Sequence, residues 1–177
     1  MTFIEISSFN QTITVETEAV LECIGDGGPN NTYQWQANSS DLIAGTSPVL
    51  TLTNVHASDG GEYTCVVSNA AGNDSASTFL YVFPYFILQP TDMQTSSGMN
   101  VTFVCEAEAF PSPEYDWERV DGGPIREEIA TNTSLLVFAP VMYGDEGGYY
   151  CNVSSLDRTI RSQDVTLTGT GVVMTGM

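Results

Sequence analysis

The stretch DGGEYTC, at residues 59–65, returns later in the chain as DEGGYYC, at residues 145–151. In both copies an aspartate stands four residues before a tyrosine, Tyr63 or Tyr149, and the tyrosine stands two residues before a cysteine. A motif that recurs with fixed internal spacing indicates a structural repeat. The chain is therefore expected to contain two similar folded units.

The repeat extends upstream of this motif. Trp35 lies twelve residues after Cys23, and Trp117 lies twelve residues after Cys105. The segments around these markers alternate between apolar and polar residues, and clusters rich in turn-forming residues, GDGGPNN, NAAGND and VDGGP, separate them. Alternation with a period of two between turn signals predicts antiparallel β-strands. No stretch has a convincing helical period, so the predicted fold class is all-β.

The four cysteines fall into two pairs, Cys23 with Cys65 and Cys105 with Cys151. An even count with this spacing is typical of disulfides formed in an oxidising compartment. The alternative is reduced, buried cysteines in a cytosolic protein. A zinc site is disfavoured because there is no Cys-x-x-Cys and only one histidine, His56.

Acceptor triplets for N-linked glycans are unusually frequent in this chain. Seven Asn-x-Ser/Thr triplets predict a secreted, glycosylated surface, although each alone is weak evidence. They begin at Asn10, Asn30, Asn38, Asn73, Asn100, Asn132 and Asn152.

The ends of the sequence predict a piece of a longer precursor. The start, MTFIEISSFN, has neither the basic nor the apolar region of a signal peptide. No segment approaches 18 consecutive apolar residues, so tethering to a membrane is expected only through segments outside this sequence.

The combination of short strands, a Cys–Trp–Cys core and a tyrosine before the second cysteine resembles the immunoglobulin superfamily. YTCVVSNAAG looks like the end of an I-set domain, and CEAEAFPSPEYDW is similar to an I-set run in which Phe110 replaces the usual glycine. The resemblance implies two tandem immunoglobulin-like β-sandwiches, each with a disulfide between strands B and F. It is closest in kind to ectodomains of cell-adhesion molecules and receptor tyrosine kinases.

The resemblance also assigns boundaries and structural roles. Domains are expected at residues 1–83 and 84–168, followed by a tail at 169–177, with Pro84 ending the last strand of the first domain. Tyr63 and Tyr149 would bond back to the turn that precedes them, and Trp35 and Trp117 would pack on the disulfides. In similar domains an arginine pairs with the aspartate of the turn. Asp145 could find this partner in Arg126, whereas Asp59 has no cation in its domain.

No residue pattern predicts catalysis, so we expect no enzyme and no cofactor. A histidine-activated nucleophile would depend on His56 alone, which falls in a predicted loop. Acidic turns such as GDGG and VDGG could supply oxygen ligands to calcium, but they lack the spacing of an EF-hand. The alternative, which we prefer, is that these acids are solvated and that no metal is bound.

The charge is strongly negative, with 22 acidic residues, four arginines and no lysine. Nine acids lie before residue 84 and thirteen acids with all four arginines lie after it, so each half carries a formal charge of −9. Such a chain repels nucleic acid and anionic lipid, and neither is expected as a partner. Two interpretations remain open, general solubility or adaptation to a high-salt habitat.

The pattern of alternation predicts a partner-binding surface on the first domain. The outward positions of its C, F and G strands carry two aromatics among amides and small residues, with no charge nearby, which is the composition of interface cores. The candidate interface residues are Gln34, Gln36, Val66, Phe79 and Tyr81. The alternative is that a loop or the domain junction covers the aromatics. A glycan on Asn152 would cover the equivalent face of the second domain.

These features predict protein–protein recognition at the cell surface, with adhesion through a second copy of the chain as one form of it. The partner would be a cell-surface or secreted protein. The alternative is the ligand-binding fragment of a signalling receptor such as a receptor tyrosine kinase. A third class is a secreted decoy or a pattern-binding immune protein.

Overall fold

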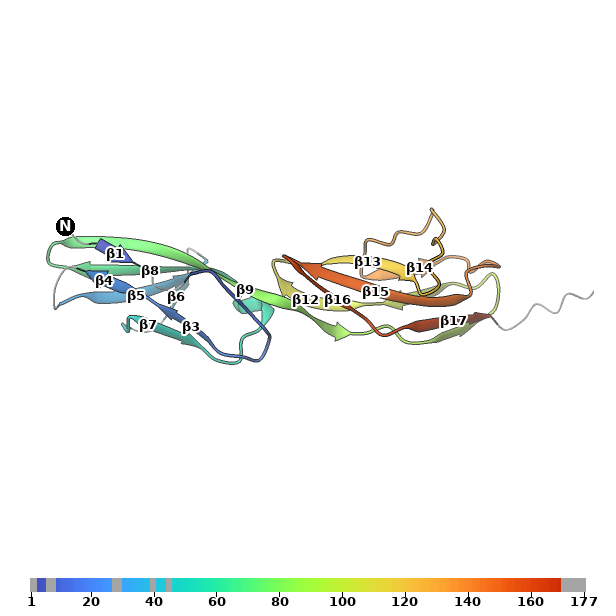
Figure 1. Cartoon of the computed structure of the whole chain (residues 1–177), viewed down its shortest axis with the longest axis horizontal. Helices are drawn as coiled ribbons and strands as arrows, with labels where there is room; N and C mark the ends of the chain where they lie inside the picture. Colours follow the sequence, from blue (N-terminus) through green and yellow to red (C-terminus); the bar gives the residue numbers. More distant parts are fainter. Residues whose placement is uncertain (1–2, 6–8, 27–29, 39–40, 44–45, 170–177) are drawn as a thin grey trace, which may run out of the picture. The chain divides into compact units, whose positions relative to one another are not determined.

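The computed structural model describes residues 3–5, 9–26, 30–38, 41–43 and 46–169 (Figure 1). Contacts between Cα atoms divide the chain into two compact units, Met1–Phe83 with Ala109–Pro111, and Pro84–Glu108 with Ser112–Met177. In the described part, the regular secondary structure consists of β-strands and one 3-10 turn, Ala57–Asp59. The expected all-β class is confirmed, and each unit is a pair of packed sheets.

The larger sheet of the first unit carries the candidate interface. Its strands run in the order β6 (Asp41–Ile43), β5 (Thr32–Ala37), β8 (Gly61–Asn69) and β9 (Gly72–Leu88), all antiparallel to their neighbours. Strand β2 (Gln11–Ile13) joins β9 in parallel. The short β6 is the one additional strand among the described residues between β5 and β7.

Two short strand pairs complete the first unit. Strand β3 (Ala19–Glu22) pairs with β7 (Val49–Leu52), and β1 (Phe3–Glu5) pairs with β4 (Ile24–Asp26). The inward side chains of both layers form the core because alternate residues of a strand face the same side. The buried apolar residues of this unit are Ala19, Leu21, Cys23, Trp35, Val55, Tyr63, Cys65, Val67, Leu80, Val82 and Ala109.

The larger sheet of the second unit has the same plan. Strand β10 (Met93–Thr95) pairs in parallel with β17 (Val165–Gly169), which lies next to β15 (Gly147–Ser155) and then β13 (Glu114–Arg119). Strand β16 (Arg158–Arg161) extends β15 as a hairpin.

The facing layer of the second unit contains β11 (Val101–Val104) paired with β14 (Leu135–Phe138). Strand β12 (Glu106–Phe110) follows β11 in the chain and is hydrogen-bonded to β9. Aromatic side chains fill the space between the layers. Phe103 contacts the rings of Trp117, Phe138 and Tyr149, with centroids 5.9 to 6.4 Å apart. Such contacts contribute beyond the apolar area that they bury.

The prediction that Pro84 ends the last strand of the first domain is wrong, because β9 continues to Leu88. The ladder of β9 with β8 extends to Leu80, and its ladder with β2 extends to Val82. Proline lacks a backbone N–H, but at position 84 it lies beyond both ladders and removes no hydrogen bond from them.

Candidate functional site

The repeated motif forms the predicted tyrosine corners. The hydroxyl of Tyr63 donates to the backbone oxygen of Asp59 at 2.6 Å, and the hydroxyl of Tyr149 donates to that of Asp145. Burial, with Asp59 nearby as a second cause, raises the pKa of Tyr63 to about 12. The repeat that reveals the fold therefore has a structural role.

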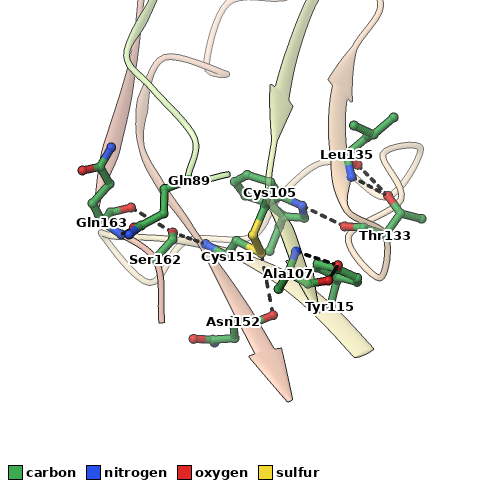
Figure 2. Close-up of a disulfide and its surroundings, with 11 residues drawn as sticks. Gln89, Cys105, Ala107, Tyr115, Thr133, Leu135, Cys151, Asn152, Ser162 and Gln163 are labelled. Carbon is green, nitrogen blue, oxygen red and sulfur yellow. Dashed lines mark hydrogen bonds between the residues drawn. A yellow bond between two sulfur atoms is a disulfide. The ribbon is translucent and has the colours of Figure 1, made fainter. Parts of the chain in front are cut away.

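Both predicted disulfides, Cys23–Cys65 and Cys105–Cys151, are present. Figure 2 shows the second one, where the backbone N–H of Cys151 donates to the Ser162 hydroxyl at 2.9 Å. The indole of Trp117 is buried beside it and donates to the backbone oxygen of Thr133 at 3.0 Å. In the first domain the indole of Trp35 donates in the same way to Ser47 at 3.3 Å.

The outward surface of the larger sheet in the first domain brings the candidate interface residues onto one face. Gln34 lies opposite Val66, and Phe79 lies opposite Glu62, in adjacent strands. We call this surface the aromatic face and define it by Gln34, Gln36, Thr64, Val66, Ser77, Phe79 and Tyr81. Its role as an interface remains a prediction.

Two stacked rings dominate the aromatic face. The centroids of Phe79 and Tyr81 are 5.9 Å apart, with 10° between the ring planes. Phe79 is 38% exposed, whereas Tyr81 is half-buried and also stacks on Phe110, which belongs to the same compact unit, at 6.5 Å. Phe79 is therefore the more available of the two rings.

The remaining groups of the aromatic face are small and polar. The hydroxyls of Thr64 and Ser77 form a hydrogen bond across the strands at 2.8 Å. Gln34 is exposed, and Gln36 and Val66 are half-buried. The prediction that no charge lies near the aromatics is wrong, because Glu62, which is half-buried, lies opposite Phe79 in the adjacent strand. An uncharged center with charge at its margin is the usual arrangement of a protein interface.

The equivalent surface of the second domain is different. Glu118 accepts hydrogen bonds from the hydroxyl of Tyr150 and from Nδ2 of Asn152, both at 2.7 Å. The guanidinium of Arg161 lies 3.8 Å from the ring centroid of Tyr150 and forms an ion pair with Asp164. The hydrogen bond to Glu118 raises the pKa of Tyr150. We call these five residues the polar face.

The glycan acceptors lie mainly at exposed positions. Asn152 is half-buried, and the six other acceptors are exposed, namely Asn10, Asn30, Asn38, Asn73, Asn100 and Asn132. Two acceptors contact the aromatic face or its edge. Oδ1 of Asn10 accepts a hydrogen bond from the backbone N–H of Phe79 at 3.0 Å, and Oδ1 of Asn38 accepts one from Glu62 at 3.2 Å. Their glycosylation stays a prediction.

Sequence reasoning missed the role of Arg119. Its guanidinium donates to the hydroxyl of Tyr149 at 2.9 Å, to backbone oxygens of Gly144 and Glu146, and to both carboxylate oxygens of Asp121. These bonds join strand β13 to the turn before β15. Hydrogen bonds from Arg119 and the backbone of Gly123 lower the pKa of Asp121 to about 2. The signal available was a lone arginine two residues after the core tryptophan.

Neither a metal centre nor a membrane span is found within the described ranges. No three His, Cys, Asp or Glu side chains gather there in an arrangement that could hold a metal ion. No helix there is long and apolar enough to cross a membrane.

Comparison with known proteins identifies relatives along most of the chain. A family model described as "Immunoglobulin domain" matches residues 3–69 and 84–155. Hemicentin-1 of Mus musculus is 30% identical over 170 residues, which cover 87% of this chain and 3% of hemicentin-1. Roundabout homolog 1 of Mus musculus is 34% identical over 131 residues, 67% of this chain and 8% of that protein. Neuronal cell adhesion molecule of Mus musculus is 30% identical over 150 residues, 76% of this chain and 12% of that protein.

This chain therefore spans between 3% and 12% of the length of these relatives. Among solved structures, the N-terminal four Ig domains of Dscam1 isoform 1.9 superpose with a TM-score of 0.68 at 20% identity, covering 90% of this chain and 43% of that chain. Dpr2 Ig1-Ig2 in complex with DIP-Theta Ig1-Ig3 superposes with a TM-score of 0.61 at 25% identity, covering 94% and 66%. The likeness to Dscam1 concerns the fold alone.

Proposed function

Because this chain belongs to the immunoglobulin-domain family, we propose that it mediates recognition between proteins outside the cell, in cell–cell adhesion, through the aromatic face of its first domain. The comparisons support a role in recognition between proteins. One relative is named neuronal cell adhesion molecule, and one similar structure is a complex of the Ig domains of two proteins, Dpr2 and DIP-Theta. The fold itself does not specify a partner, so the proposal depends on the surface.

The observation that supports this proposal is the contrast between the aromatic face and the rest of the chain. The formal charge is −18, yet the residues that define this face are uncharged, and Glu62, opposite Phe79, brings a negative charge beside them. Depletion of charge together with exposed aromatic rings is characteristic of interface centres. The polar face of the second domain instead contains charged groups that already bond to one another.

The partner that we propose is a second copy of this chain. A neutral patch can meet its own copy across a twofold axis, because the same residues then face each other. Acidic residues around the patch would repel each other in such a dimer. Added salt screens this repulsion, with a Debye length of about 10 Å at 0.1 M and about 3 Å at 1 M. Association is therefore expected to increase with salt.

Sedimentation velocity of the glycosylated protein at micromolar concentration tests the proposal. We expect reversible dimers in about 500 mM NaCl and fewer in about 10 mM NaCl. Phe79→Glu should abolish them, because it places a charge at the centre of the contact. Val137→Glu is the matched control, since Val137 has a similar exposure, 41% against 38%, on the second domain.

A monomer at both salt concentrations would contradict recognition between identical copies. It would favour the alternative of a receptor ectodomain that binds a different protein ligand. Equal loss of the dimer in both variants would place the contact elsewhere than on the aromatic face.

A further inference from the structure

One glycan acceptor, Asn10, is hydrogen-bonded directly to β9, the strand that carries Phe79 and Tyr81. It begins the triplet Asn10-Gln11-Thr12, and its Oδ1 accepts a hydrogen bond from the backbone N–H of Phe79 at 3.0 Å. This bond engages the carboxamide oxygen and does not use Nδ2, the atom that carries an N-linked sugar, and Asn10 as a residue is exposed.

The pairing of β2 with β9 places this acceptor on the same side of the sheet as the aromatics. Thr12 lies opposite Tyr81 in the parallel ladder and is exposed. Between Asn10 and Thr12, Gln11 donates from its side chain to a backbone oxygen of β3, a strand of the facing layer, and so points inward. Because neighbouring residues of an extended chain face opposite sides, Asn10 and Thr12 face outward with Phe79 and Tyr81.

The chemistry of a first sugar suits this position. One face of a pyranose ring presents several C–H groups, which are attracted to the electron-rich face of an aromatic ring. Phe79 offers such a ring, 38% exposed, on the residue whose backbone holds the Asn10 side chain. The two disulfides indicate that the chain folds in the oxidising compartment in which N-linked glycans are attached.

We propose that Asn10 carries an N-linked glycan whose first sugar packs on the ring of Phe79 and covers part of the aromatic face. This inference concerns the same surface as the proposed function and restricts it, because a chain whose Asn10 glycan lies on Phe79 leaves only the rest of the aromatic face for a partner. It does not require that function, since it describes a contact within one glycosylated chain.

Mass spectrometry of the chain secreted from animal cells tests whether Asn10 carries a glycan. The peptide that contains Asn10 should carry a glycan in the unaltered protein and in Thr12→Ser, which keeps the acceptor triplet. It should be unmodified in Thr12→Val, which removes the triplet but keeps the Asn10 side chain and its bond to Phe79. An unmodified Asn10 in the unaltered protein would overturn the proposal.

A double-mutant cycle measured by thermal unfolding tests whether the first sugar packs on the ring of Phe79. Loss of the glycan through Thr12→Val should lower the Tm by about 3 °C. In a Phe79→Leu background, which removes the ring but keeps an apolar side chain and the backbone N–H, the same change should have no effect on Tm. An equal shift in both backgrounds would overturn the packing on Phe79.

Thr102→Val provides the matched control, since it removes the triplet at Asn100 in the second domain. Its effect on Tm should be the same with phenylalanine or leucine at position 79. The masses do not depend on whether two copies associate. Melting at low protein concentration in about 10 mM NaCl, where few dimers are expected, keeps the Tm values independent of association as well.

Discussion

Arg126 binds Asp145 through two parallel hydrogen bonds, from Nε and Nη2 to the two carboxylate oxygens, at 2.8 and 2.9 Å. Asp145 is only 3% exposed and also accepts a hydrogen bond from the backbone N–H of Met142. The matching residue of the first domain, Asp59, accepts the equivalent bond from His56 at 2.8 Å. No arginine or lysine precedes Arg119 in the sequence, so Asp59 has no such cation within the first 83 residues.

Replacing Arg126 should destabilise the second domain. Arg126→Ala leaves a buried carboxylate without its cation, and we expect the free energy of unfolding to fall by about 2 to 4 kcal/mol. Urea titration, with unfolding monitored by hydrogen exchange of the backbone amides of β15, would measure this loss in the second domain. Arg161→Ala removes the same charge from an exposed ion pair and should cost about 0 to 1 kcal/mol. Equal losses in the two variants would contradict the assigned role of the Arg126 pair.

A glycine of the repeated motif is required by both conformation and space. Gly147 has a φ of 141°, and a Cβ there would lie 2.6 Å from Nη2 of Arg119. Gly72 has a similar φ, 144°, with no atom within 4 Å of the equivalent Cβ. Gly72→Ala should therefore cost only the backbone strain, about 1 to 2 kcal/mol, and Gly147→Ala about 2 kcal/mol more. Calorimetry would compare the loss of unfolding free energy in the two variants. Similar losses would show that the Arg119 side chain moves aside without destabilising the domain.

The tyrosine corner of the first domain predicts a loss of stability at alkaline pH. The pKa of Tyr63 is raised from 10.0 to about 12 in the folded protein. A raised folded pKa contributes stability that is complete below pH 10 and is lost as the pH rises from about 10 to 12.

Urea titrations between pH 8 and 11.5 would measure this loss. Tyr63→Phe should begin about 1 kcal/mol less stable, because it loses the bond to Asp59, but its stability should fall less steeply above pH 10. Parallel curves for the two proteins would contradict the assignment to Tyr63.

The net charge predicts a response of the folded state to salt. A formal charge of −18 destabilises the compact state by repulsion between its acids, and salt screens this repulsion. The Tm should therefore rise between about 10 and 500 mM NaCl, with EDTA present so that trace calcium makes no contribution. An unchanged Tm would rule out adaptation to high salt in favour of general solubility.

Much of the fold could be predicted because it depends on spacing within the sequence. The alternation around Cys65 and Cys151 determines which side chains face the core. The pairing of the cysteines was predicted from their number and spacing and from the resemblance to immunoglobulin domains, and both disulfides are present. The pairing of Arg126 with Asp145 was also predictable, since the separation of 19 residues matches that in similar domains.

Other features depend on which strands become neighbours, and no local pattern contains that information. The bond between Asn10 and Phe79 joins residues 69 positions apart, and it exists because β2 pairs in parallel with β9. Arg119 reaches Tyr149 across 30 positions for a similar reason, through the register of β13 with β15. Phe110 departs from the I-set pattern, and its contact with Tyr81 appears only in three dimensions.

The parallel pairing of β2 with β9, and of β10 with β17, has a mechanical consequence. In each domain the pair joins a strand near the beginning of the domain to the strand that leads out of it. A force that draws the two ends of a domain apart therefore shears these strands along their length and loads their hydrogen bonds together. Bonds loaded together resist tension better than bonds opened one after another, so each domain is expected to resist a force applied along its length.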